Sequence, residues 1–244
     1  MILSDNTDNI GDVFNFFPTT CIDNFYKNPD GVRNFALSLE YGDNAGNFPG
    51  VRTDNLKNID EQFYTQSVNK LLSLYFQVDI TDLEKIDWYA TTNFQKIYRY
   101  HGDRNNILNM GDIHTDNIFG GLAAVLYLDP SPSMDSGTSF YRNKKTTKFY
   151  LPQRDYMNKK ISCYKDGECD EFSKALKDNN ENYEKTLEVK NLYNRLVAYN
   201  PSTPHGQTNF CVDNEDFRLT QVFFVWFVTT DLKNPVQRIN MFDI

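Results

Sequence analysis

Three histidines and one nearby carboxylate are the residues of this chain best suited to chemistry. The 244-residue sequence contains only His101, His114 and His205, so a histidine-based site must draw on these three. His114 and Asp116 are two residues apart, and in a strand such residues project from the same face. His205 lies in the turn sequence NPSTPHG, after a strand-like segment. Two imidazoles and one carboxylate can form the facial triad that holds Fe(II) and leaves three positions open for oxygen chemistry.

A second polar pair follows thirteen residues beyond His205. Arg218 and Thr220 share one face of an expected strand, whereas Leu219 and Phe223 share the other face, which we interpret as core. A guanidinium beside a hydroxyl suits a carboxylate, because the guanidinium offers a bidentate fork and the hydroxyl adds one donor. Each motif alone is common by chance. The occurrence of all of them in this order along one chain is not, and it indicates a functional site. We interpret His101 as a solvent-facing loop residue.

The same motifs give the chain a resemblance to a known family. It resembles the 2-oxoglutarate- and Fe(II)-dependent oxygenases, in the branch similar to prolyl hydroxylases. The resemblance covers residues 93–228 and is carried by HTD at 114–116, SGTSF at 136–140, NRLV at 194–197, HG at 205–206 and RLT at 218–220. Residues 22–33 and the sequence FPGVRT at 48–53 also resemble the N-terminal part of an uncharacterised, partly phage-borne group of such oxygenases.

The resemblance implies a fold and a set of ligands. It implies a double-stranded β-helix, a form of jelly roll, in which His114, Asp116 and His205 ligate iron. Arg218 with Thr220 would hold the far carboxylate of 2-oxoglutarate.

The resemblance also implies an activity. The cofactors would be Fe(II), 2-oxoglutarate as co-substrate and O2, and 2-oxoglutarate would be decarboxylated to succinate and CO2. This step would be coupled to hydroxylation of a primary substrate, such as a peptidyl proline or a small metabolite. In related enzymes a Tyr or Asn on the strand before the HxD motif often helps to bind 2-oxoglutarate, and both Tyr98 and Tyr100 are candidates by position.

The elements that must position these residues are mainly strands, with helices at the N-terminus. We expect helices over residues 28–42 and 60–76, and one near 170–177. Apolar or alternating runs predict strands at 93–100, 121–128, 138–142, 196–199 and 218–229. The predicted fold class is a jelly roll, mainly β with flanking helices. A single domain spans 1–244: residues 1–92 form a helical support, and 93–244 form the core with an insert at 143–190.

The composition indicates which kinds of partner and which cellular compartment to expect. The chain has 25 Lys and Arg against 33 Asp and Glu, and the formal charge of −8 argues against a protein that grips phosphate backbones. Nucleic-acid demethylases of this superfamily typically have a second arginine a few residues after the first. No such arginine follows Arg218, which argues against a nucleic-acid substrate. The sequence shows no transmembrane stretch and no secretory signal. The four cysteines are scattered, which indicates free thiols in a reducing cytoplasm. If the gene is phage-borne, this would be the cytoplasm of the host.

Two other classes of protein fit part of the pattern. A non-catalytic jelly-roll binding protein could keep a metal site, although a complete ligand set argues against a decayed enzyme. A metal-dependent hydrolase on the same fold could also use two imidazoles and a carboxylate. That interpretation leaves the pair Arg218 and Thr220 without a role.

Overall fold

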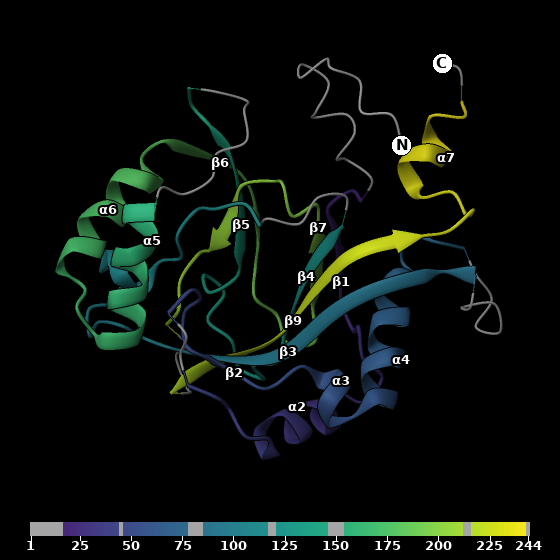
Figure 1. Cartoon of the computed structure of the whole chain (residues 1–244), viewed down its shortest axis with the longest axis horizontal. Helices are drawn as coiled ribbons and strands as arrows, with labels where there is room; N and C mark the ends of the chain where they lie inside the picture. The colour runs from purple at the N-terminus through teal and green to yellow at the C-terminus, as the bar shows by residue number, and fades with distance from the viewer. Residues whose placement is uncertain are drawn as a thin grey trace.

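Two antiparallel sheets form the centre of the computed structural model, which describes residues 17–43, 46–77, 85–116, 121–145, 154–211 and 216–242. The larger sheet has the order β1-β7-β4-β9-β3-β2 (Figure 1). Its strands are β1 (Thr20–Ile22), β2 (Val51–Arg52), β3 (Asp87–Tyr98), β4 (Leu122–Tyr127), β7 (Leu196–Tyr199) and β9 (Phe217–Thr229). The smaller sheet, of order β6-β5-β8, contains β5 (Thr138–Asn143), β6 (Tyr183–Val189) and β8 (His205–Gln207). The prediction of a mainly β fold with helices is confirmed.

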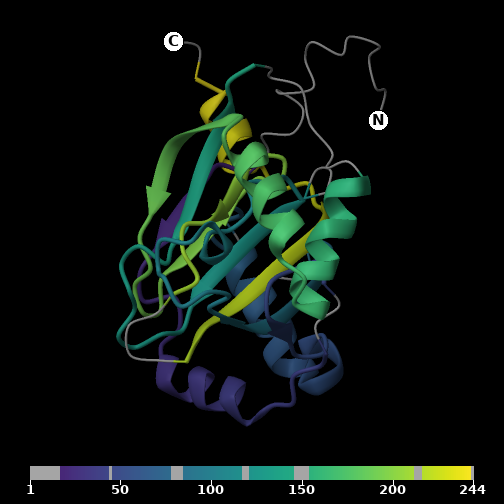
Figure 2. The same cartoon turned by 90° about the vertical axis from the view of Figure 1, so that its left-hand side faces the viewer.

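Helices cover the larger sheet and flank both sheets. The first group, α2 (Pro29–Ser38), α3 (Leu56–Ile59) and α4 (Glu61–Leu72), lies beneath the β3–β9 pair in Figure 1. The second group, α5 (Arg154–Ile161), the π-helical turn η4 (Ser162–Asp166) and α6 (Asp170–Asn180), lies along one side of the sheets (Figure 2). The short helices η3 (Ile107–Asn109) and α7 (Pro235–Ile239) complete the set. As expected, Asn28 caps α2: its side chain accepts a hydrogen bond from the Gly31 amide.

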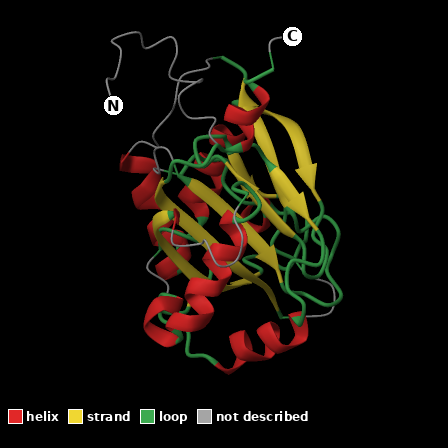
Figure 3. Cartoon of the chain, turned by 90° about the vertical axis from the view of Figure 1, so that its right-hand side faces the viewer, coloured by secondary structure: helices red, strands yellow, loops and turns green. Residues whose placement is uncertain are grey.

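The two faces of the larger sheet have different neighbours, because alternate strand residues point to opposite sides. Leu126, Phe94 and Phe223 belong to the core that packs against α2, α3 and α4. Tyr127 and Tyr199 belong to a second core shared with the smaller sheet. Figure 3 shows the strands between helices on one side and loops on the other. The face of the second core is the one on which the polar motifs gather.

Several expected boundaries differ from the observed ones. The helix expected over 60–76 is α4, which ends earlier, at Leu72. Asp60 caps it, because its side chain accepts from the Phe63 amide at 2.9 Å, and the short helix α3 precedes it. The strand expected at 93–100 begins earlier, at Asp87, whereas the one at 196–199 is confirmed. We did not predict β6, which lies inside the expected insert. It is the edge strand of the smaller sheet and is mostly exposed, so its sequence YEKTLEV lacks an apolar face.

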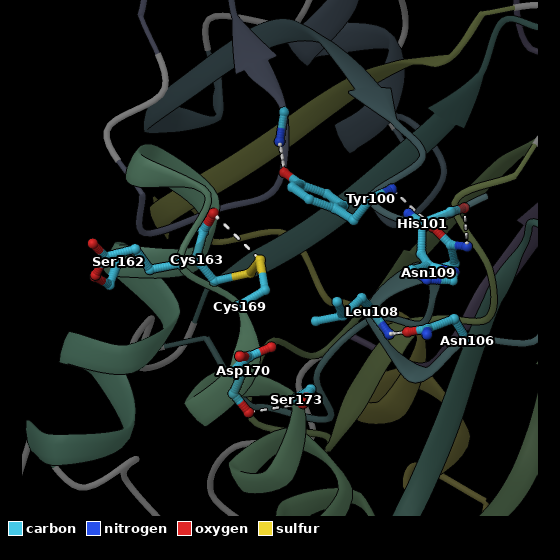
Figure 4. The surroundings of a disulfide bond; sticks show 12 residues. Tyr100, His101, Asn106, Leu108, Asn109, Ser162, Cys163, Cys169, Asp170 and Ser173 are labelled. Atoms are coloured by element: carbon cyan, nitrogen blue, oxygen red, sulfur yellow. Dashed lines mark hydrogen bonds between the residues drawn. A yellow bond between two sulfur atoms is a disulfide. The ribbon is translucent and has the colours of Figure 1, made fainter. Parts of the chain in front are cut away.

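The expectation of free thiols is wrong for two of the four cysteines. Cys163 and Cys169 form a disulfide that links η4 to the residue before α6 (Figure 4). The turn between them contains Gly167 in the left-handed region, at φ 79°, and it brings their Cα atoms to 4.3 Å. Neither Cys21 nor Cys211 is part of a disulfide among the described residues. Within the described ranges, no helix combines the length and the apolar character needed to cross a bilayer.

Candidate active site

His114, Asp116 and His205 meet at one point. Each contributes one possible ligand atom, and these atoms lie within 4.8 Å of one another. One carboxylate oxygen of Asp116 lies 3.6 Å from Nε2 of His114, and the other lies 3.4 Å from Nε2 of His205. The two imidazole centroids are 4.6 Å apart. The arrangement matches the donor set of a two-histidine, one-carboxylate metal centre.

Backbone hydrogen bonds between separate segments, rather than one continuous strand, position the three residues of the triad. His205 lies in β8 opposite Phe140 of β5. The His114 amide donates to the His205 carbonyl at 2.9 Å, and the His205 amide donates back to the His114 carbonyl at 2.8 Å. The Asp116 amide donates to the Pro201 carbonyl at 2.9 Å. The extended segment that carries His114 and Asp116 thus forms a single bridge to β8. The bond from the Asp116 amide to Pro201 is the second backbone contact that positions the carboxylate.

The hydrogen bonds of both imidazoles leave the correct nitrogen free for a metal. Nδ1 of His114 lies 2.9 Å from the Asp112 carbonyl, and Nδ1 of His205 lies 2.8 Å from the Thr203 carbonyl. Because a carbonyl oxygen only accepts, each Nδ1 carries the proton in a neutral ring, and the lone pair lies on Nε2. Both Nε2 atoms face Asp116. Such carbonyl contacts orient metal-binding histidines in proteins.

The charges at the triad shift the titration of its members. Burial acts to raise the pKa of Asp116, but the imidazoles of His205 and His114 outweigh it and hold this pKa far below its ordinary value. Burial acts to lower the pKa of His114, but the carboxylates of Asp112 and Asp116 outweigh it and raise this pKa. The site therefore keeps a charged carboxylate and attracts positive charge.

The second group of helices holds the segment that precedes the triad. Nζ of Lys160, in α5, donates to the two carboxylate oxygens of Asp112 at 3.1 and 3.0 Å, and both side chains are buried. From α6, the Asn180 side chain accepts from the Ile113 amide, and the Asn179 side chain donates to the Ile113 carbonyl, each at 3.0 Å. Part of the expected insert thus positions the residues next to His114.

Arg218 and Thr220 form a buried polar pair with unused donors. Arg218 is 1% exposed, and its Nε donates to the Ser136 carbonyl at 2.8 Å. Its Nη2 and the hydroxyl of Thr220 are buried, and neither has a hydrogen-bond partner in the described structure. Burial lowers the pKa of Arg218, although Tyr127 and Asp129 oppose this effect. An unpartnered buried donor costs about 1–3 kcal/mol, so the pair is suited to an acceptor from outside the chain.

Tyr199 connects the polar pair to the triad. Its ring lies 4.5 Å from the His205 ring, and it belongs to the second core. Its pKa is raised by burial first, and Asp116 raises it further, whereas Arg218 and Arg52 lower it. The charges of Asp116, Arg218 and Arg52 therefore all act on the Tyr199 hydroxyl.

The structure separates the two tyrosine candidates. Tyr98 pairs with Phe217 in the β3–β9 ladder, so it lies on the face opposite to Arg218, and it is 44% exposed. This placement argues against the expectation that Tyr98 binds 2-oxoglutarate. The hydroxyl of Tyr100, which Figure 4 shows, accepts from the Gly50 amide at 2.8 Å. The centroid of its ring lies 4.9 Å from that of Tyr164. As expected, His101 is exposed; its Nδ1 accepts from the Asp103 amide.

Arg52 is a polar residue of this face that we did not predict as a site residue. It lies in β2 opposite Gln95, and its Nη2 donates to the Gln95 side-chain oxygen at 3.3 Å. Burial lowers the pKa of Arg52 to about 10, while Asp116 acts in the opposite direction. A strand of two residues has no periodicity that a sequence could reveal, so only the structure brings Arg52 to the site.

Comparisons with known proteins find solved structures of similar fold. Residues 107–225 match the model of a family of unknown function, DUF6445, and no curated protein matches the sequence. HygX from Streptomyces hygroscopicus, solved with nickel and 2-oxoglutarate bound, is similar with a TM-score of 0.50 and 11% identity over 92% of this chain and 87% of that chain. EvdO2 from Micromonospora carbonacea var. aurantiaca is similar with a TM-score of 0.50 and 11% identity over 94% of each chain. A 2OG-Fe(II) oxygenase family oxidoreductase from Burkholderia pseudomallei also matches, with a TM-score of 0.43, 8% identity and 93% of each chain covered. At these identities the likeness concerns the fold.

Proposed function

We propose that this chain is a 2-oxoglutarate- and Fe(II)-dependent oxygenase on a double-stranded β-helix. The observation that carries the proposal is the coexistence of two features on one face. A His-Asp-His cluster offers metal ligands, and a buried guanidinium and hydroxyl nearby lack partners of their own. The structural neighbour HygX, which has been solved with nickel and 2-oxoglutarate, supports the same combination.

The residues of the chain divide into two groups with different roles. His114 and His205 would hold Fe(II) through Nε2, and Asp116 would hold it through its carboxylate. When bound, Fe(II) with 2-oxoglutarate and O2 supplies the oxidising power for hydroxylation of a substrate C–H bond. Arg218 and Thr220 would bind the far carboxylate of 2-oxoglutarate through Nη2 and the hydroxyl. Burial of this pair excludes water and strengthens its hold on an anion.

The proposal is tested by binding under anaerobic conditions, where no turnover occurs. Wild-type protein titrated with Fe(II) and then 2-oxoglutarate is expected to develop a metal-to-ligand charge-transfer band, and to form succinate once air is admitted. His114→Ala removes an imidazole ligand and is expected to lose the band. Arg218→Met is expected to keep Fe(II) binding but to need about 10- to 100-fold more 2-oxoglutarate, because a hydrogen bond to a charged group contributes about 1.5–3 kcal/mol.

A matched control is Arg142→Met. The Arg142 side chain is 70% exposed, and its guanidinium lies 2.7 Å from the Glu184 carboxylate on the surface. We expect it to bind both ligands as the wild type does. If wild-type protein showed no band with 2-oxoglutarate, the proposed function would be wrong. If Arg218→Met bound 2-oxoglutarate normally, its assigned role would be wrong.

A further inference from the structure

Arg52 is a second cation on the face of the larger sheet that carries Arg218 and Thr220. In the strand ladder, Arg52 lies opposite Gln95, and Gln95 lies opposite Thr220. Residues opposite one another in neighbouring strands point to the same side, and neighbouring strands are about 4.8 Å apart. Arg52 and Thr220 therefore stand in one row, two strands and about 10 Å apart.

Two aromatic rings and an amide hold the Arg52 guanidinium in place. Its central carbon lies 4.0 Å from the Phe48 ring centroid and 5.4 Å from that of Phe224, a residue on the same face of β9 as Thr220. Gln95 donates through its amide nitrogen to the Pro49 carbonyl at 2.7 Å, which turns its oxygen toward Arg52. The guanidinium is thus oriented before any ligand arrives, which lowers the entropic cost of binding an anion.

A glycine allows the segment that carries Arg52 to reach this position. Gly50 has φ +72°, and a Cβ added there would lie 1.9 Å from the Lys96 carbonyl oxygen. Only glycine fits so close to β3 in this conformation. The close approach is what brings Arg52 into register with Gln95.

The charge of Arg52 is incompletely matched by the chain. Its Nε is buried without a hydrogen-bond partner. No carboxylate in the described part of the chain forms a salt bridge with it, and its main anionic neighbour is Asp116, a residue of the triad. A buried donor without a partner is costly, and Arg is the side chain best suited to bind a carboxylate.

We propose that Arg52 binds a carboxylate of the primary substrate, so that the substrate is an organic acid or an acidic group on a peptide. This inference rests on the proposed function, in which the two carboxylates of 2-oxoglutarate are already used by Arg218 and by the metal. Arg52, two strands away from Thr220, is then available to the primary substrate. Phe48 and Phe224 offer the substrate an apolar contact.

The experiment compares an acid with its neutral amide. Protein loaded with Fe(II) and saturated with 2-oxoglutarate, without oxygen, is titrated with phenylacetate or phenylacetamide by calorimetry. The two probes share a ring and differ in charge. We expect wild-type protein to bind the acid at least tenfold more tightly than the amide. Arg52→Met should abolish this preference, Arg52→Lys should keep part of it, and the surface control Arg142→Met should leave it unchanged.

The affinity for 2-oxoglutarate separates the two possible sources of the carboxylate. If Arg52 serves the substrate, Arg52→Met binds 2-oxoglutarate within about twofold of the wild type. A tenfold loss of 2-oxoglutarate affinity in Arg52→Met, with the acid preference intact, would assign Arg52 to the co-substrate and overturn the inference. Equal affinity of wild-type protein for acid and amide, or binding of neither, would also overturn it.

Failure of the proposed function gives a different result. In that case wild-type protein develops no charge-transfer band, and the acid and amide titrations are repeated on the metal-free protein. Loss of acid preference in Arg52→Met would then still support an anion site at Arg52, whereas an unchanged preference would refute it. Thermal unfolding of each variant shows that it is folded.

Discussion

The buried ion pair between Lys160 and Asp112 gives the sharpest test of how the helical segment supports the site. Its side chains are 7% and 3% exposed, and the ammonium lies 3.0 Å from the nearer carboxylate oxygen. Lys160→Met keeps the volume of the side chain and removes its charge, so the Asp112 carboxylate is left buried without a cation. Breaking a buried pair from one side costs about 3–5 kcal/mol. For a chain of this length, that loss lowers the unfolding midpoint by about 6–20 °C.

The assay is equilibrium unfolding in urea, followed by circular dichroism, with thermal unfolding as a second measurement. Lys159→Met is the matched control, because Lys159 is the adjacent lysine and pairs with the exposed Asp155 on the surface. We expect the control to change stability too little to resolve. The double variant Lys160→Met with Asp112→Asn is expected to recover much of the loss, because it removes the unpaired charge.

Two results would refute this reasoning. In the first, Lys160→Met would be no less stable than Lys159→Met, and the pair would then contribute nothing to the fold. In the second, adding Asp112→Asn would bring no recovery. The loss would then come from the packing of the lysine stem and not from the stranded carboxylate.

Two further predictions concern the metal ligands and the disulfide. The raised pKa of His114 means that protons compete with a metal ion below this pKa, so the affinity for Mn(II) measured by calorimetry should fall as the pH falls, by up to about tenfold per unit; an affinity independent of pH would argue against His114 as a ligand. Replacing Cys163 and Cys169 together by serine opens a short loop, and the chain-entropy estimate for such a loop is about 2 kcal/mol of stability. Urea unfolding without reductant measures this loss, and a variant as stable as the wild type would mean that the two thiols are not bonded in solution.

The sequence predicts the parts of the site that depend on local spacing. His114 and Asp116 are two residues apart, and so are Arg218 and Thr220, so a short extended segment aims each pair whatever the rest of the chain does. Apolar runs likewise mark buried strands such as β7, whose four residues are all buried.

The parts that the sequence could not predict depend on distant partners. Arg52 joins the site because β2 pairs with β3, and its partner Gln95 lies far along the chain. The register between β3 and β9 places Tyr98 on the face opposite to Arg218, and alternation within one strand does not reveal this register. The edge strand β6 gains its backbone bonds from β5 while its side chains face water, so it carries no apolar signal.

The reciprocal amide bonds between His114 and His205 have a consequence for how the proposed centre would acquire a metal. The main chain fixes the two histidines relative to each other through backbone bonds that involve no ion. Most of the ordering that a metal centre requires is then completed when the chain folds, which distinguishes this centre from small metal-dependent domains that collapse around their ion. We therefore expect the protein to keep its fold in the presence of a chelator and to bind an added ion without refolding.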